Sequence, residues 1–298
     1  MQSSYVGIEM GGTKVIVAAG TGPNDLSQTV RLPTQDPQST MAAVVEAVRT
    51  VTGGRNIAGI GVATFGPVGL RPTEANYGHI LRTSKPGWTG ADVLTPLTQA
   101  FPETNLVIDT DVNGAALAEQ EWGAARELTD FAYVTVGTGI GVGLVSNGRP
   151  VHGQLHPEAG HIYVRRDAQL DPYQGRCPFH GDCLEGLASG PTLFDRTGIQ
   201  GEDLPADHPV WRLVGEYLSQ LYMNLTLVTS PQRIVVGGGL GLNSRVLSFS
   251  RDKLRNLLGG YIQSLEQSVD IERFVVGAEL GERAGVLGAI AMSKRVKL

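Results

Sequence analysis

Three glycine clusters follow short apolar segments, and they constrain the fold of this chain more than any other feature. In chain order they are Gly11-Gly12-Thr13-Lys14, Gly137-Thr138-Gly139 and Gly237-Gly238-Gly239. Glycine allows a tight backbone turn and lets a ligand approach the backbone closely. Consecutive N–H groups that point into one concavity bind anions. One such cluster fits an ordinary hairpin turn, but three at strand ends favour a nucleotide site.

The composition excludes several classes of protein. Hydrophobic residues make up 41% and charged residues 18% of the 298 residues, so the chain can bury a large core. A net charge of -5 argues against a protein that coats nucleic acid. No apolar run is long enough to span a membrane, and the first residues lack the pattern of a secretory signal. We therefore expect a cytoplasmic protein with reduced thiols and neither nucleic-acid nor membrane partners.

Apolar periodicity predicts alternating strands and helices in two similar halves. The expected strands are 5–8, 15–19, 57–63, 105–109, 131–136, 140–145, 233–236 and 274–276, and the expected helices are 37–52, 90–101, 111–126, 208–229, 243–265 and 282–293. This order indicates an α/β protein of two lobes with a cleft between them. We expect residues 1–112 plus 284–298 to form the N-terminal lobe and residues 113–283 the C-terminal lobe.

The commoner nucleotide motifs are absent from the sequence. It contains neither the Gly-x-x-x-x-Gly-Lys-Ser/Thr of a P-loop nor a strict Gly-x-Gly-x-x-Gly. The remaining interpretation of the glycine clusters is a phosphate-binding site made by paired hairpins, as in actin-like ATPases and sugar kinases.

Four segments together resemble the ROK family of sugar kinases, over essentially the whole chain. They are the phosphate motif at 7–14, the aspartate segment at 110–116, the sugar motif at 156–161 and the cysteine loop at 177–186. The last resembles the zinc-containing fructokinase branch. The resemblance implies the two-lobed actin-like ATPase fold, which is ribonuclease H-like. It also implies that the nucleotide is bound by Gly11, Gly12, Thr13, Lys14, Gly137, Thr138, Gly238 and Gly239.

Asp111 matches the catalytic base of that family. It follows an apolar strand and begins a helix, whose N-terminus favours the ionised carboxylate. Taken alone, Asp111 is simply a good helix N-cap residue, and it is the resemblance that favours the catalytic role; Asp109 is a rival two residues earlier. Glu9 stands where many family members carry an aspartate that acts on Mg²⁺, and the resemblance implies the same role. A solvated carboxylate at a strand end is the alternative for Glu9.

Two histidines and two cysteines have the composition of a closed, structural zinc site. Cys177, His180 and Cys183 lie in one short loop, and His161 would complete the tetrahedron. The expected zinc loop spans residues 161–185. A disulfide between the cysteines and four unligated side chains are the alternatives. Most family members have a cysteine where His180 stands, although the fructokinases share the histidine, and this difference in spacing makes His180 a less secure ligand than Cys183.

The sugar-binding residues implied by the resemblance are Gly66, Pro67, Asp111, Glu158, His161 and Glu185. Zinc would fix the two glutamates, since each lies close in sequence to a ligand. A zinc-bound His161 would keep one ring N–H for the sugar. The sequence offers no partner at useful spacing for His79, His152 or His208, and it favours packing over sugar stacking for Trp88.

These features predict ATP-dependent phosphorylation of D-fructose at its 6-hydroxyl, with Mg²⁺ and a structural Zn²⁺. A kinase for mannose, glucose or an amino sugar is the first alternative. A sugar-responsive ROK regulator without turnover is the second, but such repressors carry an additional N-terminal helix-turn-helix domain, for which Tyr5 leaves no room. The resemblance implies a homodimer.

Overall fold

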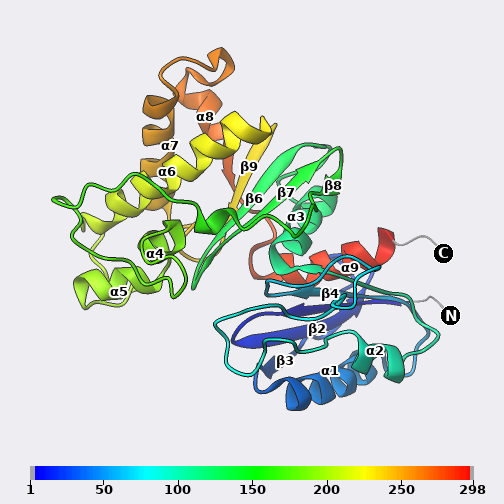
Figure 1. Cartoon of the computed structure of the whole chain (residues 1–298). Coiled ribbons are helices and arrows are strands. Elements are labelled where there is room, and N and C mark those ends of the chain that lie inside the picture. The colour runs from blue at the N-terminus through cyan, green and yellow to red at the C-terminus, as the bar shows by residue number, and fades with distance from the viewer. Residues whose placement is uncertain (1–3, 296–298) are drawn as a thin grey trace. The chain divides into compact units, whose positions relative to one another are not determined.

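The computed structural model describes residues 4–295, which form two compact units (Figure 1). The first unit contains residues 4–127, 150–157 and 282–295, and the second contains 128–149 and 158–281. The expected division at 112/113 falls inside helix α3 (Asp111–Trp122). This helix packs closely against α9 (Ala284–Arg295), and so it belongs to the first unit as a whole.

A five-stranded mixed sheet is the centre of the first unit. Its order is β3-β2-β1-β4-β5, with bounds Val30–Pro33, Lys14–Gly20, Ser4–Met10, Ile57–Thr64 and Leu106–Thr110. Strand β1 runs antiparallel to β2 and parallel to β4, which in turn runs parallel to β5. The predicted hairpin around Gly11-Gly12 is therefore confirmed.

Successive side chains of β1 point to opposite faces of this sheet, and the two faces pack against different helices. Val6, Ile8 and Met10 are fully buried in a core shared with helix α1 (Pro37–Thr52). The residues between them point to the other face, where α9 packs on β1 and β4. A Cβ atom on Gly7 would lie 2.3 Å from the Val286 carbonyl oxygen. The glycine at position 7 thus allows α9 to lie directly on the sheet. Glu9, two residues further along the strand, lies on the same face of the sheet as Gly7.

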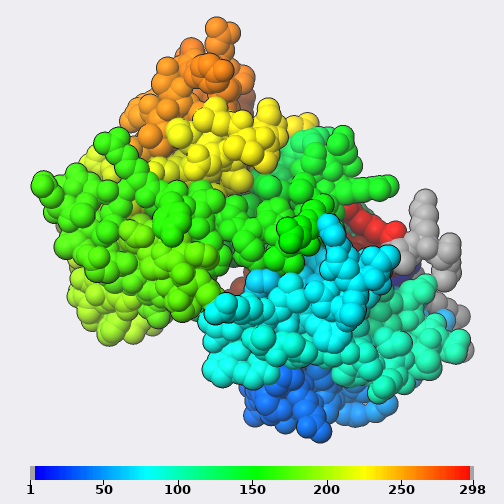
Figure 2. All heavy atoms as spheres, in the orientation of Figure 1, coloured from blue at the N-terminus to red at the C-terminus, as the bar shows by residue number. Residues whose placement is uncertain are grey.

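A long connection between β4 and helix α2 (Thr95–Ala100) covers part of the first unit, and Figure 2 shows its atoms as a continuous cyan surface. Trp88 anchors this connection. Its ring is fully buried, packs edge-on against Phe65 at 5.2 Å between centroids, and donates from Nε1 to the Gln35 carbonyl. Trp88 is therefore a packing residue, as its sequence context favoured.

The second unit repeats the strand arrangement of the first. Its sheet has the order β10-β9-β6-β7-β8, with bounds Val275–Gly277, Arg233–Gly237, Phe131–Val136, Ile140–Ser146 and Arg149–Pro150. Strand β6 is antiparallel to β7 and parallel to β9, so the second predicted glycine hairpin is also confirmed. Helices α6 (Val210–Thr229) and α7 (Ser244–Leu258) pack against each other, and apolar residues of both lie in the core with this sheet.

Several element boundaries differ from the sequence prediction. Helix α2 begins at Thr95 rather than Gly90, because Gly90 has a φ of +83° and Asp92 forms a β-bridge with His79. Helix α7 ends at Leu258 because Gly259 takes a left-handed conformation. The sequence did not predict β3, α4 (Leu184–Ala188), α5 (Pro191–Thr197), α8 (Ser268–Phe274) or the 3₁₀ turns at Ala159–His161, Gln263–Leu265 and Gly281–Arg283.

The helices formed by residues 4–295 include none with the length and apolar character needed to cross a membrane. This agrees with the lack of long apolar runs in the sequence.

Candidate active site and zinc centre

Asp111 lies at the junction of β5 and α3, as the sequence predicted, but it is not the helix cap. Thr110 is the N-cap, and its Oγ1 accepts from the Asn113 backbone N–H at 3.2 Å. Within the part of the chain that the structure describes, the Asp111 carboxylate accepts only from its own and the following backbone N–H, the latter at 2.9 Å. Burial outweighs these hydrogen bonds and raises the pKa of Asp111 to about 6. The carboxylate is still mostly ionised at neutral pH, although burial opposes the effect that we expected from the helix N-terminus.

The rival Asp109 is already engaged by other groups. Its Oδ1 accepts from Asn113 Nδ2 and from the Thr110 backbone N–H, both at 2.7 Å. Its Oδ2 lies 2.9 Å from His152 Nε2. A carboxylate held on both oxygens is a positioning group rather than a free base, which favours Asp111 as the base. The sequence did not predict that His152 would pair with Asp109.

Glu9 lies on the face of β1 that α9 covers, and its carboxylate lies beside the first turn of α9. Burial, followed by the charge of Asp111, raises the pKa of Glu9 to about 7. Among residues 4–295, the buried Oε2 of Glu9 has no hydrogen-bond partner. The alternative of a solvated strand-end carboxylate is therefore wrong. An unsatisfied carboxylate oxygen beside a second carboxylate fits a magnesium ion, which prefers oxygen ligands.

Hydrogen bonds fix the backbone of the first glycine turn, and the space beside its Gly12 is free of other atoms from the described residues. The Gly11 backbone N–H donates to the Lys14 carbonyl at 2.9 Å, and Thr34 Oγ1 donates to the Gly11 carbonyl at 2.8 Å. Lys85 Nζ donates to the Gly12 carbonyl at 2.5 Å. A Cβ atom on Gly12 would meet nothing within 4 Å, and its φ is not left-handed. Neither packing nor backbone strain requires glycine there, whereas close approach of a phosphate would.

The second turn has the same property at Gly137, where a Cβ would again meet nothing within 4 Å. Thr138 beside it is exposed. Gly238, in the third cluster, has a φ of +79°, and a Cβ there would lie 2.4 Å from the Val136 carbonyl oxygen. Its neighbour Gly239 is open. The second unit thus places two glycine clusters at neighbouring strand ends, since β6 and β9 are adjacent and parallel.

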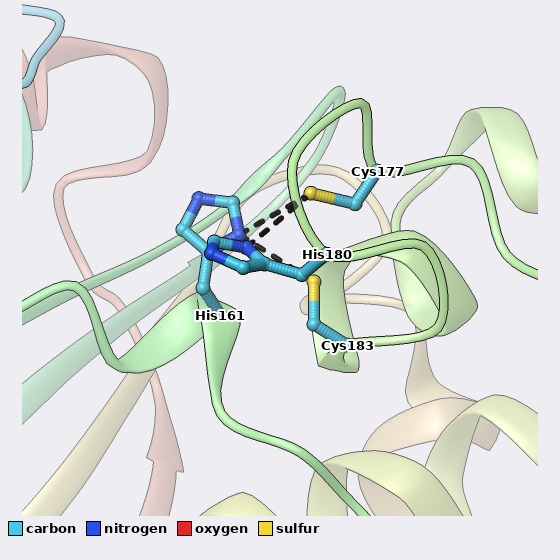
Figure 3. A group of neighbouring side chains, drawn as sticks. All are labelled: His161, Cys177, His180 and Cys183. Atoms are coloured by element: carbon cyan, nitrogen blue, oxygen red, sulfur yellow. Dashed lines mark hydrogen bonds between the residues drawn. The ribbon is translucent and has the colours of Figure 1, made fainter. Parts of the chain in front are cut away.

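The four expected zinc ligands lie together in the second unit, with their ligand atoms all within 4.8 Å of one another (Figure 3). His161 Nδ1 lies 3.5 Å from Cys183 Sγ and 3.7 Å from Cys177 Sγ, and His180 Nδ1 lies 3.7 Å from Cys177 Sγ. Tetrahedral zinc, with bonds of about 2.3 Å to sulfur and about 2.0–2.1 Å to nitrogen, gives sulfur–nitrogen separations of about 3.6 Å. The residues therefore fit a closed zinc site, and His180 fits as well as the others.

Backbone contacts hold the cysteine loop in shape. Cys177 and Gly181 exchange two backbone hydrogen bonds, of 3.1 and 2.9 Å, and so close a hairpin that carries His180. Both cysteines are buried and free. Burial raises the pKa of the Cys183 thiol to about 11, so a thiolate there requires a cation beside it.

The expected sugar-binding residues fall into two groups. Glu158, His161 and Glu185 belong to the second unit, where His161 Nε2 lies 3.9 Å from Glu185 Oε1. Gly66, Pro67 and Asp111 belong to the first unit, where a Cβ on Gly66 would lie 3.2 Å from the ring of His156. His156 is buried, and its Nε2 accepts from the Val68 backbone N–H at 3.3 Å. This supporting histidine was visible in the sequence only as part of the 156–161 motif.

Comparison with known proteins gives the class of this chain: residues 5–296 match the ROK family, and the chain belongs to it. The fructokinase of Zymomonas mobilis is 38% identical over 97% of this chain and 96% of its own length. The putative fructokinase of Bacillus subtilis is 37% identical over 96% of this chain and 94% of its own length. The crystal structure of a ROK hexokinase from Thermus thermophilus superimposes with a TM-score of 0.78 at 27% identity, covering 98% of each chain. The expected two-lobed, actin-like ATPase fold is thereby confirmed.

Proposed function

We propose that the protein is an ATP-dependent fructokinase, which transfers the γ-phosphoryl group of ATP to the 6-hydroxyl of D-fructose. By its family and its relatives the chain is a sugar kinase; the sugar and the acceptor hydroxyl are the proposed parts. Two relatives at 37% and 38% identity carry the name fructokinase, one of them as putative, and this supports fructose over the other hexoses.

The observation that carries the proposal is the Asp111 carboxylate, which accepts from no side chain among residues 4–295 and has its pKa raised to about 6. A base of this pKa is ionised at neutral pH and still binds a proton when the sugar hydroxyl releases it. In the proposed step the 6-hydroxyl oxygen bonds to the γ-phosphorus, the bond from that phosphorus to ADP breaks, and Asp111 receives the hydroxyl proton.

The other residues bind and orient the reactants. The open backbones at Gly12, Gly137 and Gly239 are proposed to accept the nucleotide phosphates, with Thr13, Lys14 and Thr138 as further donors. Glu9 is proposed to hold the magnesium ion that accompanies ATP, which supplies neutralisation of the phosphate charge. Glu158, His161 and Glu185 are proposed to accept or donate hydrogen bonds to the sugar hydroxyls, together with the Gly66-Pro67 segment.

A coupled ADP-release assay tests the proposal. Fructose, mannose, glucose and their amino derivatives are each supplied with ATP and magnesium, and the phosphorylated position is assigned by NMR. We expect the highest kcat/KM for fructose and a 6-phosphate product. A preference for another hexose would overturn the sugar assignment, and absence of ADP release with every sugar would overturn the kinase activity. Light scattering in solution tests the proposed homodimer.

A further inference from the structure

The Glu185 carboxylate contacts both the zinc centre and a glycine turn. Its Oε2 accepts from the Ile140 backbone N–H at 3.0 Å, and its Oε1 lies 3.9 Å from His161 Nε2. Gly139 makes room for this contact, because a Cβ there would lie 2.7 Å from Glu185 Oε2. The carboxylate therefore lies between a zinc ligand and the turn that precedes β7.

Two backbone contacts join the same parts of the second unit. Gly160 lies so close to the Ile140 carbonyl that a Cβ on it would be 1.9 Å from the oxygen. The Gly190 backbone N–H donates to the Gly137 carbonyl at 2.6 Å. The 137–140 turn is thus held at one end by Gly160, which directly precedes the zinc loop, and at the other by Gly190, which follows helix α4.

The zinc ligands are the immediate neighbours of these contacts. His161 follows Gly160 directly, and Cys183 is the N-cap of the short helix α4, whose second residue is Glu185. A helix of one turn has little stability of its own. An ion that fixes Cys183 and His161 therefore also fixes the positions from which Glu185 and Gly160 reach the turn.

We propose that Glu185 is a positioning residue for the nucleotide turn and that zinc, by holding Glu185, sets the affinity of the protein for nucleotide even when no sugar is bound. The inference rests on the proposed function, because it takes the 137–140 turn as a phosphate site. It adds a second role to a glutamate that the sequence connects only with the sugar.

Binding of ADP with magnesium, measured by titration calorimetry without sugar, tests the inference. The proteins compared are the full chain, Glu185→Ala, Glu185→Gln and a control, Glu216→Ala, which removes a partly exposed carboxylate of α6 in the same unit. We expect Glu185→Ala to raise the Kd for ADP about tenfold, the worth of one hydrogen bond of about 1.4 kcal/mol. Glutamine retains an oxygen that can accept from Ile140, so Glu185→Gln should stay within about threefold of the control.

Zinc removal is the second arm. The native protein is treated with a chelator, its zinc content is measured by mass spectrometry, and hydrogen exchange is followed in the peptide that covers 137–140. We expect weaker ADP binding and faster exchange in that peptide, both reversed when zinc is restored. Equal ADP affinity with and without zinc, or in Glu185→Ala and the control, overturns the inference. Failure of the unaltered, zinc-loaded protein to bind ADP overturns the proposed function instead.

Discussion

His152 Nε2 lies 2.9 Å from Asp109 Oδ2, which ties the 150–157 segment to the end of β5 within the first unit. The hydrogen bond that His152 donates to the Asp109 carboxylate raises the pKa of His152 above its ordinary value of 6.5. Asn113 completes the cluster, with its Nδ2 3.4 Å from the same histidine nitrogen. The pair therefore supports the strand end that carries the proposed base.

This pair makes stability depend on pH in a defined direction. A raised folded-state pKa of His152 stabilises the protein fully below about 6.5 and ceases to do so as the pH rises through the folded-state value. We expect His152→Ala to lower the melting temperature by a few degrees at pH 6 and by less at pH 9. A difference that stays constant over this range would contradict the assignment.

Asp111→Asn should retain the fold and lose catalysis. The amide cannot accept the hydroxyl proton, so we expect kcat to fall by about 10² to 10⁴-fold with unchanged thermal unfolding. Asp109→Asn is the matched comparison, because its loss should be smaller and accompanied by lower stability. Turnover of a folded Asp111→Asn protein at nearly the original rate would exclude Asp111 as the base.

The pH profile of kcat should report the same carboxylate. Protonated Asp111 cannot act as a base, so kcat should fall about tenfold per pH unit below its pKa of about 6. Excess magnesium should move the inflection to lower pH, since positive charge beside Glu9 favours both ionised carboxylates. A kcat that is flat from pH 5 to pH 8 would contradict the prediction.

Two glycine substitutions should distinguish a glycine that is needed for nucleotide binding from one that is needed for packing. Gly137→Ala enters open space, so we expect normal thermal stability and a raised Kd for ATP. Gly61→Ala would place a Cβ 1.9 Å from the Ala289 carbonyl oxygen, so we expect a loss of stability of about 1–3 kcal/mol or more. The measurements are thermal unfolding and nucleotide titration of both proteins. Unimpaired ATP binding by Gly137→Ala would remove this turn from the nucleotide site.

Zinc removal should lower stability and sugar affinity together. Four ligands in a closed set would make a bound zinc ion part of the folded structure. We expect one zinc per chain by mass spectrometry and a lower melting temperature in Cys183→Ser, with a raised KM for fructose. A zinc-free preparation with the full melting temperature and unchanged KM would contradict the coupling.

The parts of the fold that depend on neighbouring residues were predictable from the sequence. The hairpins β1–β2 and β6–β7 follow from alternating apolar residues around glycine turns. The gathering of His161, Cys177, His180 and Cys183 was also predictable, because three of these four residues occupy one short loop. In both cases the decisive contacts lie close together along the chain.

The contacts that join distant segments were not predictable. His152 contacts Asp109 because residues 150–157 return to the first unit, and nothing in the local pattern indicates that return. The raised pKa of Asp111 likewise depends on burial by surrounding structure rather than on the helix terminus. The alternating polar residues Asp109, Asp111 and Asn113 were the available signal for a side-chain network at this strand end.

Helix α9 has a consequence for how the protein is made. It lies on β1 and β4, and the Val286 backbone N–H donates to Glu9. The earliest strand of the chain thus receives its covering only from the last residues that the structure describes. While the ribosome still holds α9, one face of the first sheet stays exposed, and the proposed magnesium ligand cannot reach its final surroundings. During synthesis the first sheet therefore stays uncovered on this face until α9 has left the ribosome.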